Sequence, residues 1–135
     1  SPFRAMGRSW MECMPSMSVW GEEDVWFTLD EATANSLKKA AAVFGHSQLL
    51  IETDSGSIKL SVVDPDNSTA NEYSIVVDGG YKSENFKFII NISNLKMLPG
   101  SYNVKISKKL ISQFTNEESN VVYWIALEKT STYGE

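Results

Sequence analysis

The residues that could perform catalysis or hold a metal ion are few and far apart in this sequence. The chain has one histidine, His46, and one cysteine, Cys13, and no Ser-His-Asp set or metal-ligand spacing appears in the sequence. Asp64 and Asp66 flank Pro65, which is typical of a turn, because a calcium loop needs more ligands at fixed spacing. The run 78–80, Asp-Gly-Gly, lacks the later glycine and the helix of a dinucleotide site. The sequence therefore predicts no enzyme, no metal site and no cofactor.

Lysines are the other residues that could form a functional site, and two of them fall on one side of a predicted helix. Asp30 is a good N-cap, and Gly45 closes a helix that reaches about Phe44. At 3.6 residues per turn, one stripe of this helix is apolar and is expected to pack on a sheet; it comprises Ala34, Leu37, Ala41 and Phe44. The opposite arc is small or cationic apart from one acid, and it comprises Glu31, Asn35, Lys38, Lys39 and Ala42.

A second, much shorter helix is predicted inside the stretch NFKFIINISNLKMLPGSYNVKIS, residues 85–107. Apolar residues alternate with polar ones on both sides of it, which predicts two strands. Ser93-Asn94 offers an N-cap for residues 95–98, and Pro99-Gly100 ends the turn. Leu95 and Leu98 are expected to point inward, and Lys96 outward.

Both helices thus show a cationic outer face, although the chain carries a formal charge of −5. One interpretation is an ordinary solvated surface, where lysine is common. The other is a surface that faces phosphates through sequence-independent, salt-sensitive contacts. A further basic group, Lys105, Lys108 and Lys109, lies near a predicted hairpin, and either a nucleic-acid contact or a solubilising turn would account for it.

Length and composition predict one domain from 25 to 135. It is preceded by a segment in which apolar residues follow no clear helical or strand period. The 135 residues suffice for a core without disulfides or metal. No apolar run approaches the ~18 residues of a membrane span, and residues 1–20 lack the apolar core of a signal peptide. Residues 1–24 are expected to be a linker, a docking segment or the tail of an upstream element.

The order of predicted elements repeats. Residues 26–77 indicate β-α-β-β-β, with a tight hairpin at Ser55-Gly56, and residues 85–128 indicate the same order again. A mobile connection is expected from Asp78 to Glu84. We expect two similar units side by side, each with one helix on one face of its own antiparallel sheet, which is an α+β architecture.

Two stretches carry a family resemblance: YSIVVDGGYKSENFKFIINISNLKMLPGSYNVKIS, from residue 73, and NVVYWIALEKTSTY, from residue 120. They resemble the C-terminal domain of the DNA polymerase sliding clamps, or processivity factors, of T-even-type bacteriophages. The resemblance implies the DNA-clamp fold, in subunits that join head to tail into a homo-oligomeric ring. Helices would line its hole, so that Lys38, Lys39, Lys96 and Asn35 face duplex DNA, with Lys105, Lys108 and Lys109 either at its rim or merely solubilising.

The resemblance also implies partners and a location. The partners are double-stranded DNA read without sequence preference, DNA polymerase, a clamp loader and late-transcription proteins, in the cytoplasm of an infected bacterial host and away from membranes. Partner proteins would insert a peptide into an apolar groove for which the expected residues are Val19, Trp20, Ala126, Leu127 and Tyr133.

Two points stay open at this stage. Clamp subunits of this family carry two such domains, so the chain is either part of a two-domain subunit or a short homologue that would need six copies for a ring. The alternative function is a non-enzymatic protein-interaction β-domain, such as a phage structural or adaptor module, whose lysines are only surface residues.

Overall fold

The computed structural model describes residues 23–64, 66, 72–82 and 84–134. Its first half holds β1 (Val25–Leu29), α3 (Glu31–Phe44), β2 (Gln48–Asp54), β3 (Ser57–Val63), β4 (Tyr73–Val77) and β5 (Gly79–Tyr81). Its second half holds β6 (Phe86–Asn91), the 3₁₀ helix η1 (Ile92–Leu95), β7 (Tyr102–Ser107), β8 (Ile111–Asn116), β9 (Val121–Ala126) and β10 (Thr132–Tyr133). The predicted α+β class and the repeated element order are confirmed.

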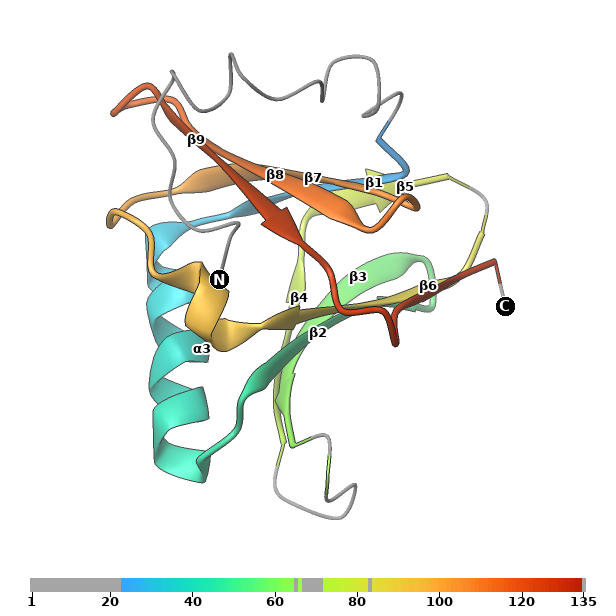
Figure 1. The fold of residues 1–135 in the computed structure, drawn as a ribbon, viewed down its shortest axis with the longest axis horizontal. Coiled ribbons are helices and arrows are strands. Elements are labelled where there is room, and N and C mark those ends of the chain that lie inside the picture. Colours follow the sequence, from blue (N-terminus) through green and yellow to red (C-terminus); the bar gives the residue numbers. More distant parts are fainter. Residues whose placement is uncertain (1–22, 65, 67–71, 83, 135) are drawn as a thin grey trace.

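The two halves do not form two separate sheets, which corrects the expectation of units lying side by side. One sheet has the order β5-β1-β7-β8-β9 and the other β10-β6-β2-β3-β4, so the first strand of each half belongs to the other half's sheet. We call them sheet A and sheet B. All the pairings are antiparallel, and Figure 1 shows the two sheets as layers with α3 at one end. The strands other than β5 and β10 were predictable from alternation, whereas the pairing of the strands depends on contacts between distant residues.

The core lies between the two sheets and is built by alternate residues of each strand. Phe27 of β1 pairs with Val104 of β7, and Val104 pairs with Phe114 of β8; all three are buried. Sheet B contributes Ile51, Leu60 and other aliphatic residues in the same way. Because side chains of a strand alternate between faces, one face of each sheet is apolar and buried.

Helix α3 begins and ends where its caps predict. Asp30 accepts a hydrogen bond from the backbone N–H of Thr33 at 2.7 Å, and Gly45 adopts the left-handed conformation at φ 72°. Leu37 and Ala41 are buried against the sheets, as predicted. Phe44 was expected on the same stripe but is 38% exposed at the end of the helix, close to His46.

Three predictions for the chain after β4 are wrong in detail. The short helix spans Ile92–Leu95 rather than 95–98, because Asn91 and not Ser93 caps it. Leu98 lies beyond the helix and is 51% exposed instead of pointing inward. The run from Asp78, expected to begin a mobile connection, instead contributes β5, which pairs with β1.

The Asp30 cap makes the stability of α3 depend on pH. The hydrogen bonds to Thr33 hold the pKa of the Asp30 carboxyl below its ordinary value of 3.8. A carboxyl with a lowered folded-state pKa stabilises the fold above its unfolded pKa and stops doing so as the pH falls through the folded one. We therefore expect Asp30→Ala to lower the thermal midpoint at neutral pH, with a difference that shrinks below about pH 4.

Thermal unfolding followed by circular dichroism across this pH range is the measurement. Asp30→Asn is the matched control, because asparagine also caps helices but does not titrate. It should stay near the wild-type midpoint at neutral pH. An Asp30→Ala deficit that is the same at pH 7 and pH 3 would contradict the assignment.

Candidate nucleic-acid interface

The outward face of α3 presents the polar residues that the sequence predicts there. Asn35, Lys38 and Lys39 are all exposed, while Leu37 between them is buried. This arrangement follows from the helical period, since anchoring one stripe on the sheets turns the opposite arc toward solvent. The helix offers two ammonium groups among small residues.

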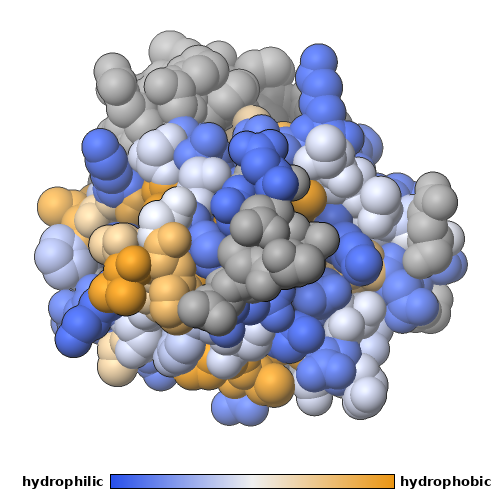
Figure 2. Space-filling model, turned by 90° about the horizontal axis from the view of Figure 1, so that it is seen from below, coloured by the Kyte–Doolittle hydropathy of each residue, from blue (hydrophilic) through white to orange (hydrophobic). Residues whose placement is uncertain are grey.

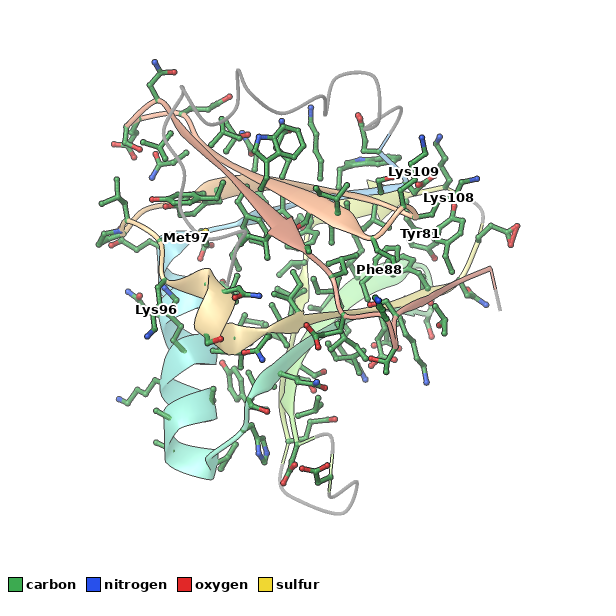
Figure 3. All side chains as sticks on the ribbon, viewed as in Figure 1. Tyr81, Phe88, Lys96, Met97, Lys108 and Lys109 are labelled. Carbon is green, nitrogen blue, oxygen red and sulfur yellow. The ribbon has the colours of Figure 1, made fainter. Side chains whose placement is uncertain are left out.

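Lys96 lies beside α3 although more than fifty residues separate it from Lys38 in the chain. An apolar crevice of about 20 Å³ separates the two elements; α3 contributes Ala34, Leu37 and Lys38, and the η1 region contributes Ile92, Leu95 and Met97. Figure 3 shows Lys96 and Met97 next to α3, at the same end of the molecule. Lys96 itself is exposed. The fold therefore brings Lys38 and Lys96 to the same end of the molecule.

Two buried tyrosines of sheet A hold the loop that carries Lys96. The hydroxyl of Tyr123 accepts a hydrogen bond from the backbone N–H of Leu98 at 3.0 Å, and the hydroxyl of Tyr102 donates to the carbonyl of the same residue. Burial raises the pKa of Tyr102, so its hydroxyl keeps its proton at neutral pH. On the other side, Ile92 donates its N–H to Ser47 O at 2.9 Å, beside sheet B. Lys96 is thus positioned from both sheets.

A family-level comparison decides what kind of domain this is. The sequence family described as gp45 sliding clamp, C-terminal, matches residues 27–129, which is most of the chain. The chain belongs to the gp45 sliding clamp C-terminal family. The match covers α3, η1 and all strands of both sheets except β10 and the first residues of β1.

Individual relatives agree with this assignment. The sliding clamp of Vibrio phage KVP40 is 31% identical over 104 residues, which are 76% of this chain and 46% of that protein. The sliding clamp of Escherichia phage RB69 is 36% identical over 74 residues, 53% of this chain and 32% of that protein. The chain therefore spans less than half the length of these relatives.

Solved structures show the same fold at low identity. A C. crescentus beta sliding clamp superposes with a TM-score of 0.60 at 16% identity, covering 87% of this chain and 33% of that one. A DNA polymerase III beta subunit from Eubacterium rectale gives 0.58 at 12% identity, covering 86% and 33%. The clamp fold expected from the sequence is confirmed.

The second basic group of this clamp domain does not join the first. Lys105 lies on the outer face of sheet A, paired across the strands with Trp26 and Gln113. Lys108 and Lys109 follow β7 in the turn to β8. Figure 3 shows Lys108 and Lys109 at the opposite end of the molecule from Lys96. These three residues are therefore separate from the surface formed by α3 and Lys96.

The expected partner-peptide groove stays a prediction. Val19 and Trp20 lie outside the described residues. Ala126 ends β9 in sheet A, and Leu127 is buried, with its N–H bonded to Leu110 O at 3.0 Å. Tyr133 belongs to β10 of sheet B, and its ring stacks on Phe88 with centroids 6.1 Å apart. The described members thus come from different sheets, and Tyr133 packs against the core.

The residues that position Lys96 were not predicted from the sequence. Asn91 accepts hydrogen bonds from the N–H and the hydroxyl of Ser93, at 2.9 and 2.7 Å. An Asn-x-Ser triplet after an apolar strand indicates such a cap, whereas the roles of Tyr102 and Tyr123 depend on tertiary contacts.

Among the described residues, no three His, Cys, Asp or Glu side chains gather as a metal site. No helix in the same part of the chain is long and apolar enough to cross a membrane.

The Tyr123 hydroxyl should be needed to hold the loop of Lys96. Tyr123→Phe keeps the ring in the core and removes the acceptor for the Leu98 N–H, which costs about 1 kcal/mol of unfolding free energy. We expect that loss in denaturant unfolding, together with faster hydrogen exchange at the Leu98 amide by NMR. Tyr73→Phe, on β4, is the control. Leu98 exchange as slow as in the wild type would show that the bond does not hold the loop.

Proposed function

We propose that this domain is part of a DNA sliding clamp subunit, which encircles duplex DNA and tethers the replicative polymerase for processive synthesis. The observation that carries the proposal is that Lys38 of α3 lines a crevice whose other wall includes Met97, the chain neighbour of Lys96, so that the two lysines lie at the same end of the fold. Asn35 and Lys39 extend this surface along α3. We call these four residues the helix face.

The chemistry of the helix face suits a contact that slides. Lysine interacts with phosphate as a flexible point charge, whereas arginine forms bidentate, fixed pairs. A few such contacts bind without reading bases and weaken as salt rises. The formal charge of the chain is −5, so an acidic body would direct the duplex to the few cationic surfaces.

A ring requires that the domain join its neighbours, and the sheets provide open edges for this. Among the described strands, β4 ends sheet B and β9 ends sheet A. A free strand edge carries backbone groups that can pair with another chain. Val76 on β4 is 55% exposed, and at the C-terminal end of α3 Val43 is 72% exposed. Figure 2, seen from below, shows apolar residues gathered at the left, the side of the molecule where Figure 1 places α3.

Within this proposal, residues 25–135 form the clamp domain and residues 1–24 connect it to a preceding part of the subunit. Because the chain covers only 28% to 46% of its phage relatives, a second domain or further copies would complete the ring. We place the protein in the cytoplasm of an infected bacterium, with the clamp loader and late-transcription proteins as further partners. It acts by holding DNA rather than by catalysis.

Removing charge from the helix face should weaken retention on DNA. In the full-length protein, Lys38→Gln with Lys96→Gln is expected to shorten the lifetime of loaded clamps on circular primed DNA several-fold. The salt dependence should flatten by up to about two units of log–log slope, because each phosphate contact contributes about 0.9. Polymerase run length with the matching clamp loader is the second measurement.

The control is Lys87→Gln with Lys129→Gln, which removes the same charge from exposed positions on sheet B and beyond β9. These variants should load and slide as the wild type does. If both double variants lose retention equally, net charge rather than the helix face is responsible. If neither does, the assignment of the face is wrong.

The strand edge gives a separate prediction about assembly. Val76→Lys puts a charge on β4 that would have to be desolvated if this edge joins a neighbouring chain. We expect the full-length protein to shift from ring to smaller species in light scattering, at concentrations where the wild type is a ring. Thr130→Lys, an exposed position outside the strands, is the control and should leave the mass unchanged. An unchanged ring in Val76→Lys would exclude β4 from the joint.

A further inference from the structure

One row of side chains on the outer face of sheet A, the face turned away from sheet B, becomes less exposed toward the edge of the sheet. Across the strands, Trp26 of β1 pairs with Lys105, Lys105 with Gln113, and Gln113 with Trp124 of β9. Trp26 is 40% exposed and Lys105 is exposed, whereas Gln113 is half-buried and Trp124 is only 1% exposed. Yet β9 ends the sheet among the described strands. A side chain on an edge strand has a strand on one side only, so Trp124 should be the most exposed of the row.

The protein core does not account for the burial of Trp124. Its chain neighbours Tyr123 and Ile125 belong to the core between the two sheets. Because side chains of a strand alternate between faces, the indole of Trp124 lies on the outer face. Sheet B lies on the inner side of sheet A (Figure 1), so it cannot reach this ring.

Trp124 is the centre of an apolar patch on β8 and β9. Ile111 pairs with Ala126, and Val122 and Ala126 lie two residues to either side of Trp124, so all share its face. We call Ile111, Val122, Trp124 and Ala126 the β9 patch; apart from Trp124 its members are half-buried. An uncovered apolar patch beside an open strand edge would promote association with other chains. The patch is therefore expected to have a cover.

The cover has to come from outside the described part of the chain, where few segments are long enough or close enough. The candidates are residues 1–22, 65, 67–71, 83 and 135. Residues 65 and 67–71 join two strands of sheet B, and residue 135 follows β10 of the same sheet. Residue 83 follows β5, which ends sheet A at the edge opposite to β9. Residues 1–22 remain.

Residues 1–22 begin their path at the right place to reach the patch. The N–H of Asp24 is bonded to Ile106 O at 2.8 Å, which fixes the start of β1 beside the end of β7. The pairs Val25–Ile106, Ile106–Ser112 and Ser112–Ile125 place this point level with Ile125. From β1, strand β9 is three strand spacings away, about 14 Å. Because an extended residue spans about 3.3 Å, about five residues before Asp24 suffice.

The composition at that distance suits an apolar surface. Residues 13–21, Cys-Met-Pro-Ser-Met-Ser-Val-Trp-Gly, carry no charged side chain and include Met14, Met17, Val19 and Trp20. Methionine adapts to irregular apolar surfaces and makes favourable contacts with aromatic rings. The acids follow only at residues 22–24, nearer the lysines: Asp24 lies 3.7 Å from the ammonium of Lys82.

We propose that the segment from Met14 to Trp20 packs across the outer face of sheet A and covers the β9 patch, with Met17 and Trp20 against the indole of Trp124. The occupant of the patch is thus this chain itself. While the segment is in place, the patch is closed to solvent and to other proteins. The contact is intramolecular and lies away from the helix face, so it does not rest on the proposed function.

The test measures the solvent exposure of each indole N–H by NMR in the ¹⁵N-labelled 135-residue protein, with a soluble gadolinium chelate as the relaxation agent. In the wild type, we expect strong relaxation enhancement at Trp26 and little at Trp124. Met17→Ser with Trp20→Ser should raise the enhancement at Trp124 several-fold and leave Trp26 unchanged. With ¹³C-labelled methionine methyl groups, Met17 should show contacts to the ring of Trp124, and Met97, in the crevice beside α3, should show none.

The matched control is Phe3→Ser with Met6→Ser, which removes apolar side chains from the same terminal segment outside residues 14–20. It should leave Trp124 protected, and the NMR spectrum of each variant reports whether the fold is intact. Continued protection of Trp124 in the Met17 and Trp20 variant overturns the proposal, and so does equal exposure in both variants. A second copy of the chain as the cover would make the protection in the wild type fall on tenfold dilution, which also overturns it. DNA retention enters none of these measurements, so this test is separate from that of the helix face.

Discussion

The exchange of the first strands between the two sheets is the constraint on which the rest of the structure depends. Because β1 lies in sheet A while β2 lies in sheet B, the segment between them must cross from one sheet to the other, and α3 is that segment. The segment containing η1 makes the reverse crossing, from β6 in sheet B to β7 in sheet A. Both helices are therefore brought to the same end of the fold (Figure 1). The position of the helix face follows from the way the sheets are built.

Other crossings between the sheets are made without helices. β4 of sheet B passes into β5 of sheet A through the single residue Asp78, and β9 of sheet A reaches β10 of sheet B through residues 127–131. Directly after the first of these crossings, Gly79 has no room for a Cβ, because the paired strand β1 approaches its backbone closely. The fold thus has helical crossings at one end and narrow ones elsewhere, and the cationic residues of α3 and Lys96 occur at the helical end.

Sequence rules predicted the structure correctly where interactions between neighbouring residues determine it. The α3 caps, the alternation in β2 and β3, and the exposed lysines of α3 follow from neighbours a few residues apart, and the sequence predicted them. The hairpin at Ser55-Gly56 is also present, with both residues at positive φ, 51° and 89°. The family resemblance supplied the family and the fold class, both in agreement with the comparisons.

The features that could not be predicted from the sequence are determined by tertiary contacts. Gly79 and Gly80 have no side chain to reveal a strand, and β5 forms only because β1 offers a partner. The orientation of Leu98 is set by Tyr102 and Tyr123, which hold its backbone and leave its side chain outside. For the same reason the placement of Lys96 beside α3, and the separation of Lys108 and Lys109 from it, became visible only in three dimensions.

The location of β1 within its sheet has a mechanical consequence. The strand lies between β5 and β7 and is bonded on both sides, although it is the first strand of the domain. A pulling force applied to the chain before Asp24 would run along β1 and load two ladders of hydrogen bonds in shear at once, where many bonds must break together. A strand at a sheet edge would share that load with one neighbour only. The domain is thus built to resist tension at the point where the preceding chain meets it.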